Sequence, residues 1–509
     1  MLSAYTGKQV RAAEVPLLDA GLGDVLMQRA AHGLAQVAAA ELAASGGVYG
    51  STVVVLAGSG NNGGDALYAG ARLQRRGAGT TAILTSDRVH ADALAAFRAA
   101  GGRAEQLTDS NLDDLAARTA GADLVLDGIL GTGGVGGLRD AAAELVKRTA
   151  AYGRPGRVVA CDVPSGVNAD TGEVSGQVLE ADVTVTFGAL KTGLVAGAGA
   201  RAAGRVVPID IGLNETLPTP DAYVLEPEDL RSLYAVPRPS DHKYSRGVLG
   251  IAAGSAMYPG AAVLVTGAAL GTGVGMIRFL GPQAVTSLIN TVHPEAVCSQ
   301  DSVGESHVQA WLVGPGATED EGQHQRAHDA IASGLPTVVD AGALPLLPET
   351  VGGNVILTPH AGELAALFER RGNSVSREAI EAAPADFARR AARETGATVL
   401  LKGSTTVVAA PSGELFCQTN ATPWLATAGS GDTLAGILGA LVATNADNDD
   451  VAAALGLPPS SRWGALAAAA AMLHGLAGRR AARSGPVVIS DLPSYVGQVL
   501  AELIPLRDP

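Results

Sequence analysis

One stretch near the C-terminus has residues of the right type and spacing to bind a phosphate and move a proton. In Asn420 to Leu441 (NATPWLATAGSGDTLAGILGAL), Ser430, Gly431 and Asp432 lead into an apolar run. Glycine lets backbone N–H groups approach a ligand, and the start of a helix attracts anions. A phosphate would repel a carboxylate there unless the carboxylate takes a proton from a neighbouring hydroxyl. Asp432 is therefore a candidate general base, although an isolated carboxylate at such a position is more often an N-cap.

A second group of polar residues lies after apolar runs in the first half of the chain. In parallel sheets ligands bind beyond the carboxyl ends of the strands, so we expect this group to meet at one edge. Asn62, Asp127 and Ser165 offer oxygen ligands, which suit a hard cation. Each residue alone fits a turn or a cap equally well. The runs are Thr52 to Ala57 (TVVVLA), Leu124 to Asp127 (LVLD) and Val158 to Asp162 (VVACD), and the polar residues are Asn61, Asn62, Asp65, Asp127, Asp162 and Ser165.

A glycine-rich loop, Gly131 to Gly137 (GTGGVGG), forms a flexible backbone cradle of the kind that approaches phosphates. It does not follow a strand and open a helix as G-x-G-x-x-G, with an acidic residue about twenty positions further on, so we reject a standard dinucleotide redox fold. The loop after the first strand also lacks the lysine and hydroxyl of a Walker phosphate loop. The ligand chemistry must therefore come from another kind of site.

Short apolar strands alternate with helical stretches along most of the chain, which predicts an α/β fold. At 509 residues the chain is too long for one ordinary core. The alternation favours two three-layer domains with largely parallel sheets and right-handed crossovers. Prolines interrupt helices, and a proline-rich segment at 211–239 marks a linker. We therefore predict two domains, at residues 1–218 and 219–509.

The charge and composition exclude several classes of function. A formal charge of -14 argues against nucleic acid or an anionic membrane as a partner. Cys161, Cys298 and Cys417 lack metal-type spacing, so we expect reduced, structural cysteines in a cytoplasmic protein. Charged residues precede the first apolar run, so no signal peptide is expected. Val248 to Ile277 is uncharged and long enough to span a bilayer, but its internal glycines and proline predict buried core elements instead.

Two more motifs in the second half carry groups that suit a nucleotide and a second ligand. Lys402 to Thr406 (KGSTT) follows a short strand, and its lysine and hydroxyls suit a phosphate or base site. Thr358 to Glu363 (TPHAGE) brings His360, which would face the second ligand together with Asp432. Taken alone, Lys402 is typical of a solvated strand end and His360 of a hydrogen-bonded structural histidine. The combination with the Ser430-to-Asp432 loop is far more specific.

Three first-half motifs, GSGNNGGD, LVLDGILGTG and VVACDVPSGVNADTG, resemble the N-terminal epimerase domain of the bifunctional NAD(P)H-hydrate repair enzymes over residues 8 to 214. The resemblance implies a Rossmann-like parallel sheet, a potassium ion held by Asn62, Asp127 and Ser165, and an acid/base role for Asp162. Ala66 stands where the family often has glycine. The residues implied to contact the hydrated NADH or NADPH are Asn61, Asn62, Gly63, Gly64, Asp65, Gly131, Thr132, Gly133, Gly134, Val135, Gly136, Gly137 and Asp162.

GSGDTLAGI, with KGxxT and TPHxGE upstream, resembles the ribokinase-like superfamily over residues 225 to 505, and within it the ADP/ATP-dependent NAD(P)H-hydrate dehydratases. The resemblance implies a ribokinase-like α/β domain that uses ADP and Mg²⁺, with Asp432 as catalytic base. Ala317, Ala361 and Trp424 depart from the family pattern and leave the pocket detail open. The implied hydrate-binding residues are Ala261, Gly316, His360 and Asp432, and the implied nucleotide-binding residues are Lys402, Gly403, Ser404, Thr405, Thr406 and Gly431.

Together the two resemblances predict an enzyme with two activities on hydrated NADH and NADPH. The first half would interconvert the R and S hydrates, and the second would return the S hydrate to NAD(P)H with ADP, releasing AMP and phosphate. The preference for ADP over ATP rests on the resemblance alone. Two alternatives stay open: a ribokinase-like small-alcohol kinase, such as a vitamin-precursor kinase, with a non-catalytic dinucleotide-binding first half, and a sensing or scaffolding module without turnover. Only small-molecule partners are expected, and a homo-oligomer is left open.

Overall fold

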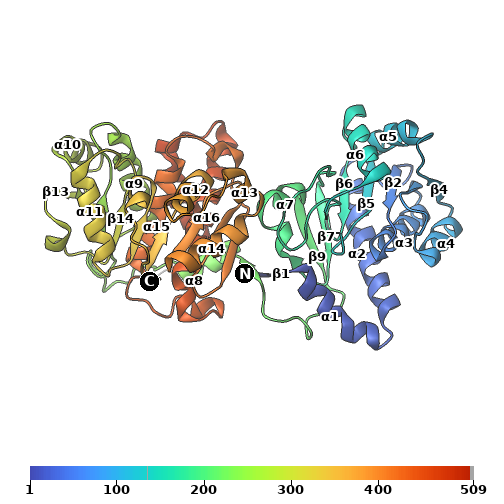
Figure 1. Ribbon diagram of the computed structural model, residues 1–509, viewed down its shortest axis with the longest axis horizontal. Helices are drawn as coiled ribbons and strands as arrows, with labels where there is room; N and C mark the ends of the chain where they lie inside the picture. Colours follow the sequence, from blue (N-terminus) through green and yellow to red (C-terminus); the bar gives the residue numbers. More distant parts are fainter. Residues whose placement is uncertain (135, 505–509) are drawn as a thin grey trace. The chain divides into compact units, whose positions relative to one another are not determined.

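The computed structural model describes residues 1–134 and 136–504, and the chain forms two compact units (Figure 1). One unit comprises residues 3–221, and the other comprises residues 1–2 and 222–509. The first two residues join the C-terminal unit because the N-terminal amine of Met1 pairs with Glu226 at 3.3 Å and Asp229 at 2.8 Å. The contacts thus divide between Asp221 and Ala222, and the predicted domain limit between 218 and 219 stays a prediction. Val135 lies outside the described residues.

The 3–221 unit is built on a parallel sheet of order β4-β3-β2-β5-β6-β7-β9. The first strand of this sheet, β2, lies in its middle. The next two strands, β3 and β4, extend the sheet to one edge, and β5 then pairs on the other side of β2. Such a reversal of strand order is where ligands bind in open α/β sheets. The strands are β2 (Thr52–Ala57), β3 (Gly79–Leu84), β4 (Arg103–Gln106), β5 (Leu124–Gly128), β6 (Val158–Cys161), β7 (Val183–Phe187) and β9 (Arg205–Ile209); outside this sheet, β1 (Leu2–Tyr5) and β8 (Leu190–Lys191) pair in parallel.

Helices cover both faces of this sheet, because successive strand residues point to opposite sides. Val53 and Val55 of β2 join one apolar core, and Val54 and Leu56 join the other. The first core is covered by α2, α3 and α4 and the second by α5 and α6 (Figure 1). The helices are α1 (Gly7–Asp19), α2 (Gly23–Ala44), α3 (Asn61–Arg75), α4 (Ala91–Ala99), α5 (Leu112–Ala120), α6 (Asp140–Tyr152) and α7 (Gly197–Ala202).

The C-terminal unit has a sheet of order β13-β12-β11-β14-β15-β16-β17-β18-β19-β10. Neighbouring strands are parallel except around β18, which pairs antiparallel with β17 and β19. Strand β18 therefore returns along β17 directly after the Lys402-to-Thr406 motif. The strands are β10 (Ala222–Val224), β11 (Val248–Ala252), β12 (Met276–Leu280), β13 (Val297–Ser299), β14 (Ala310–Val313), β15 (Thr337–Val339), β16 (Val355–Leu357), β17 (Thr398–Leu401), β18 (Thr406–Ala409) and β19 (Leu415–Gln418).

One large core of this unit joins alternate strand residues to α9, α10, α15, α16 and α17. Helices α11 and α14 pack against β14 and β17 outside that core (Figure 1). The unit is therefore a three-layer α/β domain, as predicted. The helices are α8 (Leu230–Leu233), α9 (Pro259–Thr272), α10 (Gln283–Val292), α11 (Glu321–Ala332), α12 (Ala361–Arg370), α13 (Arg377–Ala382), α14 (Pro384–Thr395), α15 (Ser430–Thr444), α16 (Arg462–Ala481) and α17 (Leu492–Leu503).

The uncharged segment 248–277 supplies β11, α9 and the start of β12, which are buried core elements. Helix α9 has 14 residues. In the part of the chain that the structure describes, no helix is long and apolar enough to cross a membrane.

The structure departs from the sequence-based expectation at the first glycine motif. Asn61 to Asp65 was predicted to lie in a loop, but α3 begins at Asn61 and contains all of these residues. Helix formation here depends on close packing that only glycine allows, since a Cβ on Gly63 would lie 2.3 Å from the carbonyl oxygen of Gly58. The sequence pattern also missed the edge strand β4, because its RAEQ sequence lacks the apolar run of an interior strand.

Candidate active sites

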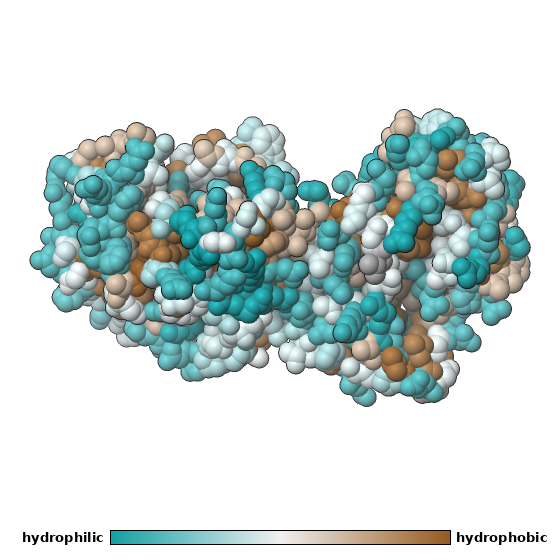
Figure 2. All heavy atoms as spheres, in the orientation of Figure 1, coloured by the Kyte–Doolittle hydropathy of each residue, from teal (hydrophilic) through white to brown (hydrophobic). Residues whose placement is uncertain are grey.

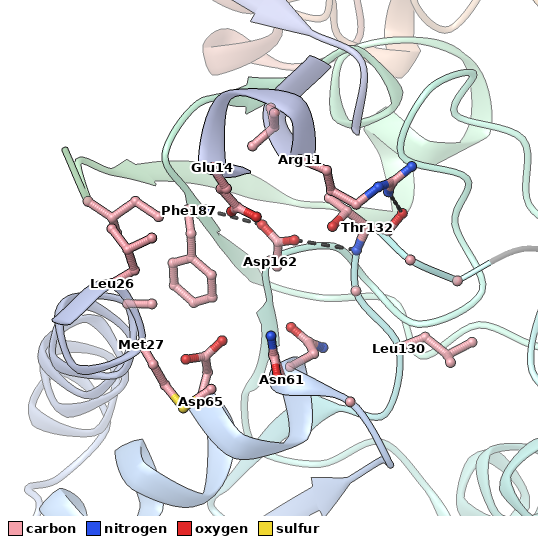
Figure 3. A pocket seen from close by; sticks show the side chains of 18 of the residues that line it. Arg11, Glu14, Leu26, Met27, Asn61, Asp65, Leu130, Thr132, Asp162 and Phe187 are labelled. Carbon is pink, nitrogen blue, oxygen red and sulfur yellow. Dashed lines mark hydrogen bonds between the residues drawn. The ribbon is translucent and has the colours of Figure 1, made fainter. Parts of the chain in front are cut away.

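A cavity of about 430 Å³ opens in the 3–221 unit beyond the carboxyl ends of β2, β5 and β6 (Figure 3). Among the residues predicted to bind the hydrated dinucleotide, Asn61, Asn62, Asp65, Thr132 and Asp162 line it. They come from the start of α3, from the loop after β5 and from the residue after β6. The structure therefore brings together three segments that are far apart in the sequence. Gly131, Gly133 and Gly134 complete the predicted part of the lining.

Four predicted glycines lie elsewhere. Gly63 packs against Gly58 behind the cavity, and Gly64 packs against His90. Gly136 and Gly137 line a neighbouring hollow of about 270 Å³, which shares Leu130 and Gly134 with the cavity. The glycine loop thus forms the wall between two hollows, and direct ligand contact by these four residues stays a prediction.

An apolar wall faces the polar groups of the cavity. Leu26 and Met27 of α2 line that wall, as does Leu18 of α1 (Figure 3). The corner between α1 and α2 is also apolar on the outside, where Val15 and Val25 are 49% and 42% exposed (Figure 2). The cavity therefore offers apolar contact on one side and carboxylates on the other, which suits a ring that carries polar substituents.

Asp162 is rigidly held. Its backbone has φ 66°, a left-handed conformation that residues other than glycine rarely adopt. Its Oδ1 accepts hydrogen bonds from the Lys191 ammonium at 2.5 Å, the Phe187 N–H at 3.1 Å and the Thr186 hydroxyl at 3.3 Å. Its Oδ2 accepts the Thr132 N–H at 3.4 Å. One oxygen of this carboxylate is saturated, whereas the other is nearly free.

Asp65 is a second buried carboxyl group of the same cavity. It is 8% exposed, and its Oδ1 has no hydrogen-bond partner among the described residues. Burial raises the pKa of Asp65 well above its ordinary value, and the charges of Asp162 and Glu14 raise it further. Asp65 therefore keeps its proton to a higher pH than a free aspartic acid does.

We expect Asp65→Asn to increase stability progressively as the pH rises from about 4 to 8. An unfolded chain ionises this aspartate near pH 4, but the folded chain resists ionisation, so unfolding releases a proton above that pH and wild-type stability falls. Asparagine cannot ionise, and the variant escapes this loss. Calorimetry of the full chain should show a melting temperature of the 3–221 unit that is higher by about 2 °C or more at pH 8, but not at pH 4. A difference that does not depend on pH would contradict the shifted titration.

Sequence reasoning missed three charged residues of this cavity: Arg11, Glu14 and Lys191. Arg11 donates to the carbonyl oxygen of Thr132, and Glu14 points from α1 toward Asp162 (Figure 3). Burial raises the pKa of Glu14, against the opposing effect of Lys191. One signal was available, since Lys191 is the only charged residue between Asp182 and Arg201. Helix α1 gave no such signal, because its charged side chains fit an ordinary exposed helix face.

The predicted cation ligands lie together at the carboxyl end of β5. The Ser165 hydroxyl donates to Oδ1 of Asp127 at 2.6 Å, and the Ser165 N–H donates to Oδ2 at 2.8 Å. Burial raises the pKa of Asp127, which is fully buried and has no ion-pair partner among the described residues. The Asn62 side chain packs on Gly131, and its Nδ2 also lacks a partner within the described chain. A buried carboxylate without a counter-charge suits a hard cation, to which Asn62 would offer its amide oxygen and not its Nδ2, and the bound ion stays a prediction.

In the C-terminal unit, Asp432 lies in the first turn of α15. The N-cap position of α15 is Gly429, with φ 83°, so Asp432 is not the N-cap. Burial raises the pKa of Asp432 to about 6; the charge of Asp340 adds to this rise, and Lys402 opposes it. A carboxylate with a pKa near the operating pH is suited to general base catalysis.

Lys402 is not a solvated strand-end lysine. Its ammonium lies 2.8 Å from Oδ1 of Asp340 and 3.8 Å from Oε2 of Glu363. Burial lowers the pKa of Lys402, but the two carboxylates outweigh burial and the net shift is upward. A Cβ on Gly431 would lie 3.4 Å from this ammonium. Lys402 therefore stays charged directly beside the start of α15.

His360 lies beside Lys402, because the backbones of the two residues form an isolated parallel bridge. Its Nδ1 accepts hydrogen bonds from the N–H groups of Gly362 and Glu363 at 3.0 and 3.2 Å, so His360 caps α12. Its side chain is 58% exposed. The capping role fixes the ring and leaves its other edge accessible to a ligand.

The other two predicted hydrate-binding residues are in contact. A Cβ on Gly316, where φ is 63°, would lie 2.7 Å from the Cβ of Ala261. Ala261 is in the first turn of α9, which packs along α15: a Cβ on Gly429 would meet Leu264, and one on Gly436 would meet Ala268. The two helices thus run in the same direction, and their first turns, which carry Ala261 and Asp432, share one end of the unit.

The nucleotide motif is a turn between β17 and β18. Gly403 and Ser404 are exposed at the turn, and Thr405 is buried. Lys402, the first residue of the motif, brings it beside the start of α15, because its ammonium lies close to Gly431. The nucleotide contacts of Lys402, Gly403, Ser404, Thr405, Thr406 and Gly431 stay predictions.

Comparison with known proteins assigns each unit. The family model described as NAD(P)H-hydrate dehydratase matches residues 249–500, and the model described as YjeF-related protein N-terminus matches residues 23–193. The bifunctional NAD(P)H-hydrate repair enzyme Nnr of Mycobacterium tuberculosis is 42% identical over 462 residues, covering 88% of this chain and 91% of that protein. The NAD(P)H-hydrate epimerase of Microbacterium testaceum is 47% identical over 218 residues, covering 42% of this chain and 81% of that protein.

A solved ADP/ATP-dependent NAD(P)H-hydrate dehydratase from Bacillus subtilis, co-crystallised with ATP and Mg²⁺, is 26% identical with a TM-score of 0.47, and covers 55% of this chain and 99% of that one. The fold and its two carboxylate-centred sites define a two-domain α/β enzyme. The chain belongs to the family of bifunctional NAD(P)H-hydrate repair enzymes.

Proposed function

We propose that the protein repairs hydrated NADH and NADPH in two steps. The 3–221 unit interconverts the R and S hydrates, and the C-terminal unit converts the S hydrate to the reduced cofactor at the expense of ADP, releasing AMP and phosphate. The observation that carries this proposal is the position of Asp432, a half-buried carboxylate in the first turn of α15 beside the charged Lys402. A base beside a positively polarised helix end is what proton removal during phosphoryl transfer requires.

In the dehydration, the hydroxyl to be lost is on a carbon bonded to the ring nitrogen. Asp432 removes the proton of this hydroxyl while the hydroxyl oxygen attacks the terminal phosphoryl group of the nucleotide. The N–H groups at the start of α15 and the ammonium of Lys402 stabilise the charge that develops on the phosphoryl oxygens. The lone pair of the ring nitrogen then expels phosphate, and loss of a proton from the neighbouring carbon restores the double bond.

Mg²⁺ would neutralise part of the nucleotide charge. Such ions bind through substrate phosphates and one or two carboxylates. Asp340 and Glu363 are the carboxylates available, since both lie within 4 Å of Lys402. Carboxylate oxygens are the ligands that Mg²⁺ prefers, so these two side chains suit the ion. Their role in binding it is part of the proposal.

In the epimerisation, Asp162 is the acid/base group at the hydrated carbon. Its nearly free Oδ2 at the cavity supports this role. Whether the ring opens or water leaves and returns, one group must accept a proton and another must supply one. K⁺ held by Asn62, Asp127 and Ser165 would supply the missing positive charge beside the buried carboxylate and fix the loop after β5.

One experiment tests the proposal. The full chain is incubated with a mixture of R and S hydrates, with and without ADP, and the absorbance of the reduced nicotinamide is followed. ADP-dependent recovery of both epimers is expected. Recovery of the S share alone would show a silent first unit, and no recovery together with phosphorylation of another alcohol would indicate a kinase. Replacing ADP with ATP measures the nucleotide preference, which stays a prediction, as do the cytoplasmic location and the oligomeric state.

A further inference from the structure

Lys191 is an unusual feature of the epimerase cavity. The residue is 1% exposed, yet it is among the residues that line the cavity. Its ammonium donates to Oδ1 of Asp162 at 2.5 Å and to the carbonyl oxygen of Phe187 at 2.6 Å. It is carried by β8, whose pairing with β1 sets Tyr5 opposite Lys191. Two short strands therefore hold a charged group immediately behind a catalytic candidate.

Stability alone does not account for this ion pair. Removing an ammonium from water costs several kcal/mol, and apolar residues of similar volume usually serve stability as well or better. The partner is also in a costly conformation, since Asp162 has φ 66°. Strained residues and buried charges of this kind cluster at functional sites. The combination at one cavity wall points to a role in the reaction.

The bonds of Asp162 show what that role is. Three donors, including Lys191, occupy Oδ1, whereas Oδ2 accepts the Thr132 N–H at 3.4 Å. The other charged groups facing Asp162 are Glu14 and Asp65, both carboxyls, and Arg11, which is bound to the Thr132 carbonyl oxygen. Lys191 is therefore the cation that pairs directly with Asp162 in the described chain, and it leaves one oxygen for a ligand.

We propose that Lys191 is a positioning residue for epimerisation: it fixes Asp162 through Oδ1, so that Oδ2 alone exchanges a proton with the substrate. This inference rests on the proposed epimerase function of the 3–221 unit. It assigns Lys191 no direct bond to the reacting atoms. The proton moves between Oδ2 of Asp162 and the oxygen on the hydrated carbon.

The test compares Lys191→Met, Lys191→Gln and Lys191→Arg with wild type in the full chain. Conversion of the pure R hydrate is followed by chromatographic separation of the epimers across pH 5–9. Lys191→Met should lower kcat at least ~100-fold and change KM less than ~3-fold, since base catalysis contributes about 10²–10⁴-fold. The acidic limb of its pH–rate profile should move to higher pH by about one unit or more, because loss of the ammonium makes the neighbouring carboxylate easier to protonate. Lys191→Arg should have a kcat at least ~10-fold higher than that of Lys191→Met, and the acidic limb of its pH–rate profile should return to the wild-type position.

The controls separate positioning from folding. Lys147→Met removes an exposed lysine of α6 and should leave the rate and the pH profile unchanged. Lys191→Gln keeps a hydrogen-bond donor without the charge, and the acidic limb of its pH–rate profile should also move to higher pH. This variant supplies the test if Lys191→Met does not fold. Turnover of the S hydrate by the same chains should stay constant. A wild-type chain that does not interconvert the epimers would overturn the proposed function and this inference together. If Lys191→Met and Lys191→Gln both interconvert the epimers at the wild-type rate, with the acidic limb of the pH–rate profile unmoved, the inference about Lys191 alone is overturned.

Discussion

Asp432→Asn is expected to lower dehydration of the S hydrate by at least ~100-fold while changing nucleotide affinity by less than ~3-fold. Asparagine has nearly the same shape, so the start of α15 keeps its geometry and its N–H groups. It cannot accept the hydroxyl proton, and the attacking oxygen remains a poor nucleophile. Turnover is measured from the absorbance of the reduced nicotinamide, and nucleotide affinity by calorimetry. Full turnover in the variant would remove Asp432 from the mechanism.

The same residue sets the expected pH dependence. A base acts in its ionised form, and the pKa of Asp432 is raised to about 6, so wild-type kcat/KM for the hydrate should fall as the pH drops through about 6. The residual activity of Asp432→Asn should lack this acidic limb. Asp386→Asn is a matched control, because Asp386 is an exposed acidic residue in the first turn of α14. That control should retain both the rate and the limb.

Asp162→Asn is expected to lower interconversion of the R and S hydrates by at least ~100-fold and to destabilise the 3–221 unit. The variant loses the oxygen proposed to act as acid and base, and it also leaves the buried ammonium of Lys191 without a counter-charge. Breaking a buried ion pair by removing one partner costs about 3–5 kcal/mol. Chromatography of the epimers measures the rate, and calorimetry of the full chain measures the stability.

Two comparisons make the Asp162 result specific. Asp109→Asn replaces an exposed aspartate of the same unit and should change neither quantity. The double variant Asp162→Asn with Lys191→Met should recover part of the lost stability without recovering the rate, because no unpaired charge remains buried. A rate near wild type in the stable double variant would show that the reacting group lies elsewhere in the cavity.

The two carboxylates proposed to be catalytic, Asp432 and Asp162, have different surroundings. Asp432 has a raised pKa because burial and Asp340 outweigh the nearby Lys402. Asp162 instead is bound by three donors on one oxygen, and the cavity carboxyl with the strongly raised pKa is Asp65. Environments that separate the proton affinities of neighbouring carboxyl groups are a usual means of dividing acid and base roles. The Asp65→Asn and Lys191 experiments together test this division in the epimerase cavity.

The sequence alone determined the fold class and the approximate places of the candidate reacting groups. Apolar strands alternating with helices predict parallel three-layer domains, and the loops after β2, β5 and β6 were expected to meet because the carboxyl ends of parallel strands share an edge. The Asp432 loop was recognisable because glycine, a carboxylate and an apolar run occur together at the start of one helix. Such patterns depend only on residues that are close in the sequence, so they can be recognised without knowing how the chain packs.

Only the tertiary structure decided which partners surround those groups. Lys191 and Asp162 are 29 positions apart and Lys402 and Asp340 are 62 apart, so no local pattern links them. Glu14 reaches the cavity from a helix whose charged residues are typical of an exposed face. The extent of α3 was missed because it depends on the clearance between Gly63 and Gly58. Charge pairing and close packing depend on distances between remote segments, and those distances are set by how the sheets and helices pack in three dimensions.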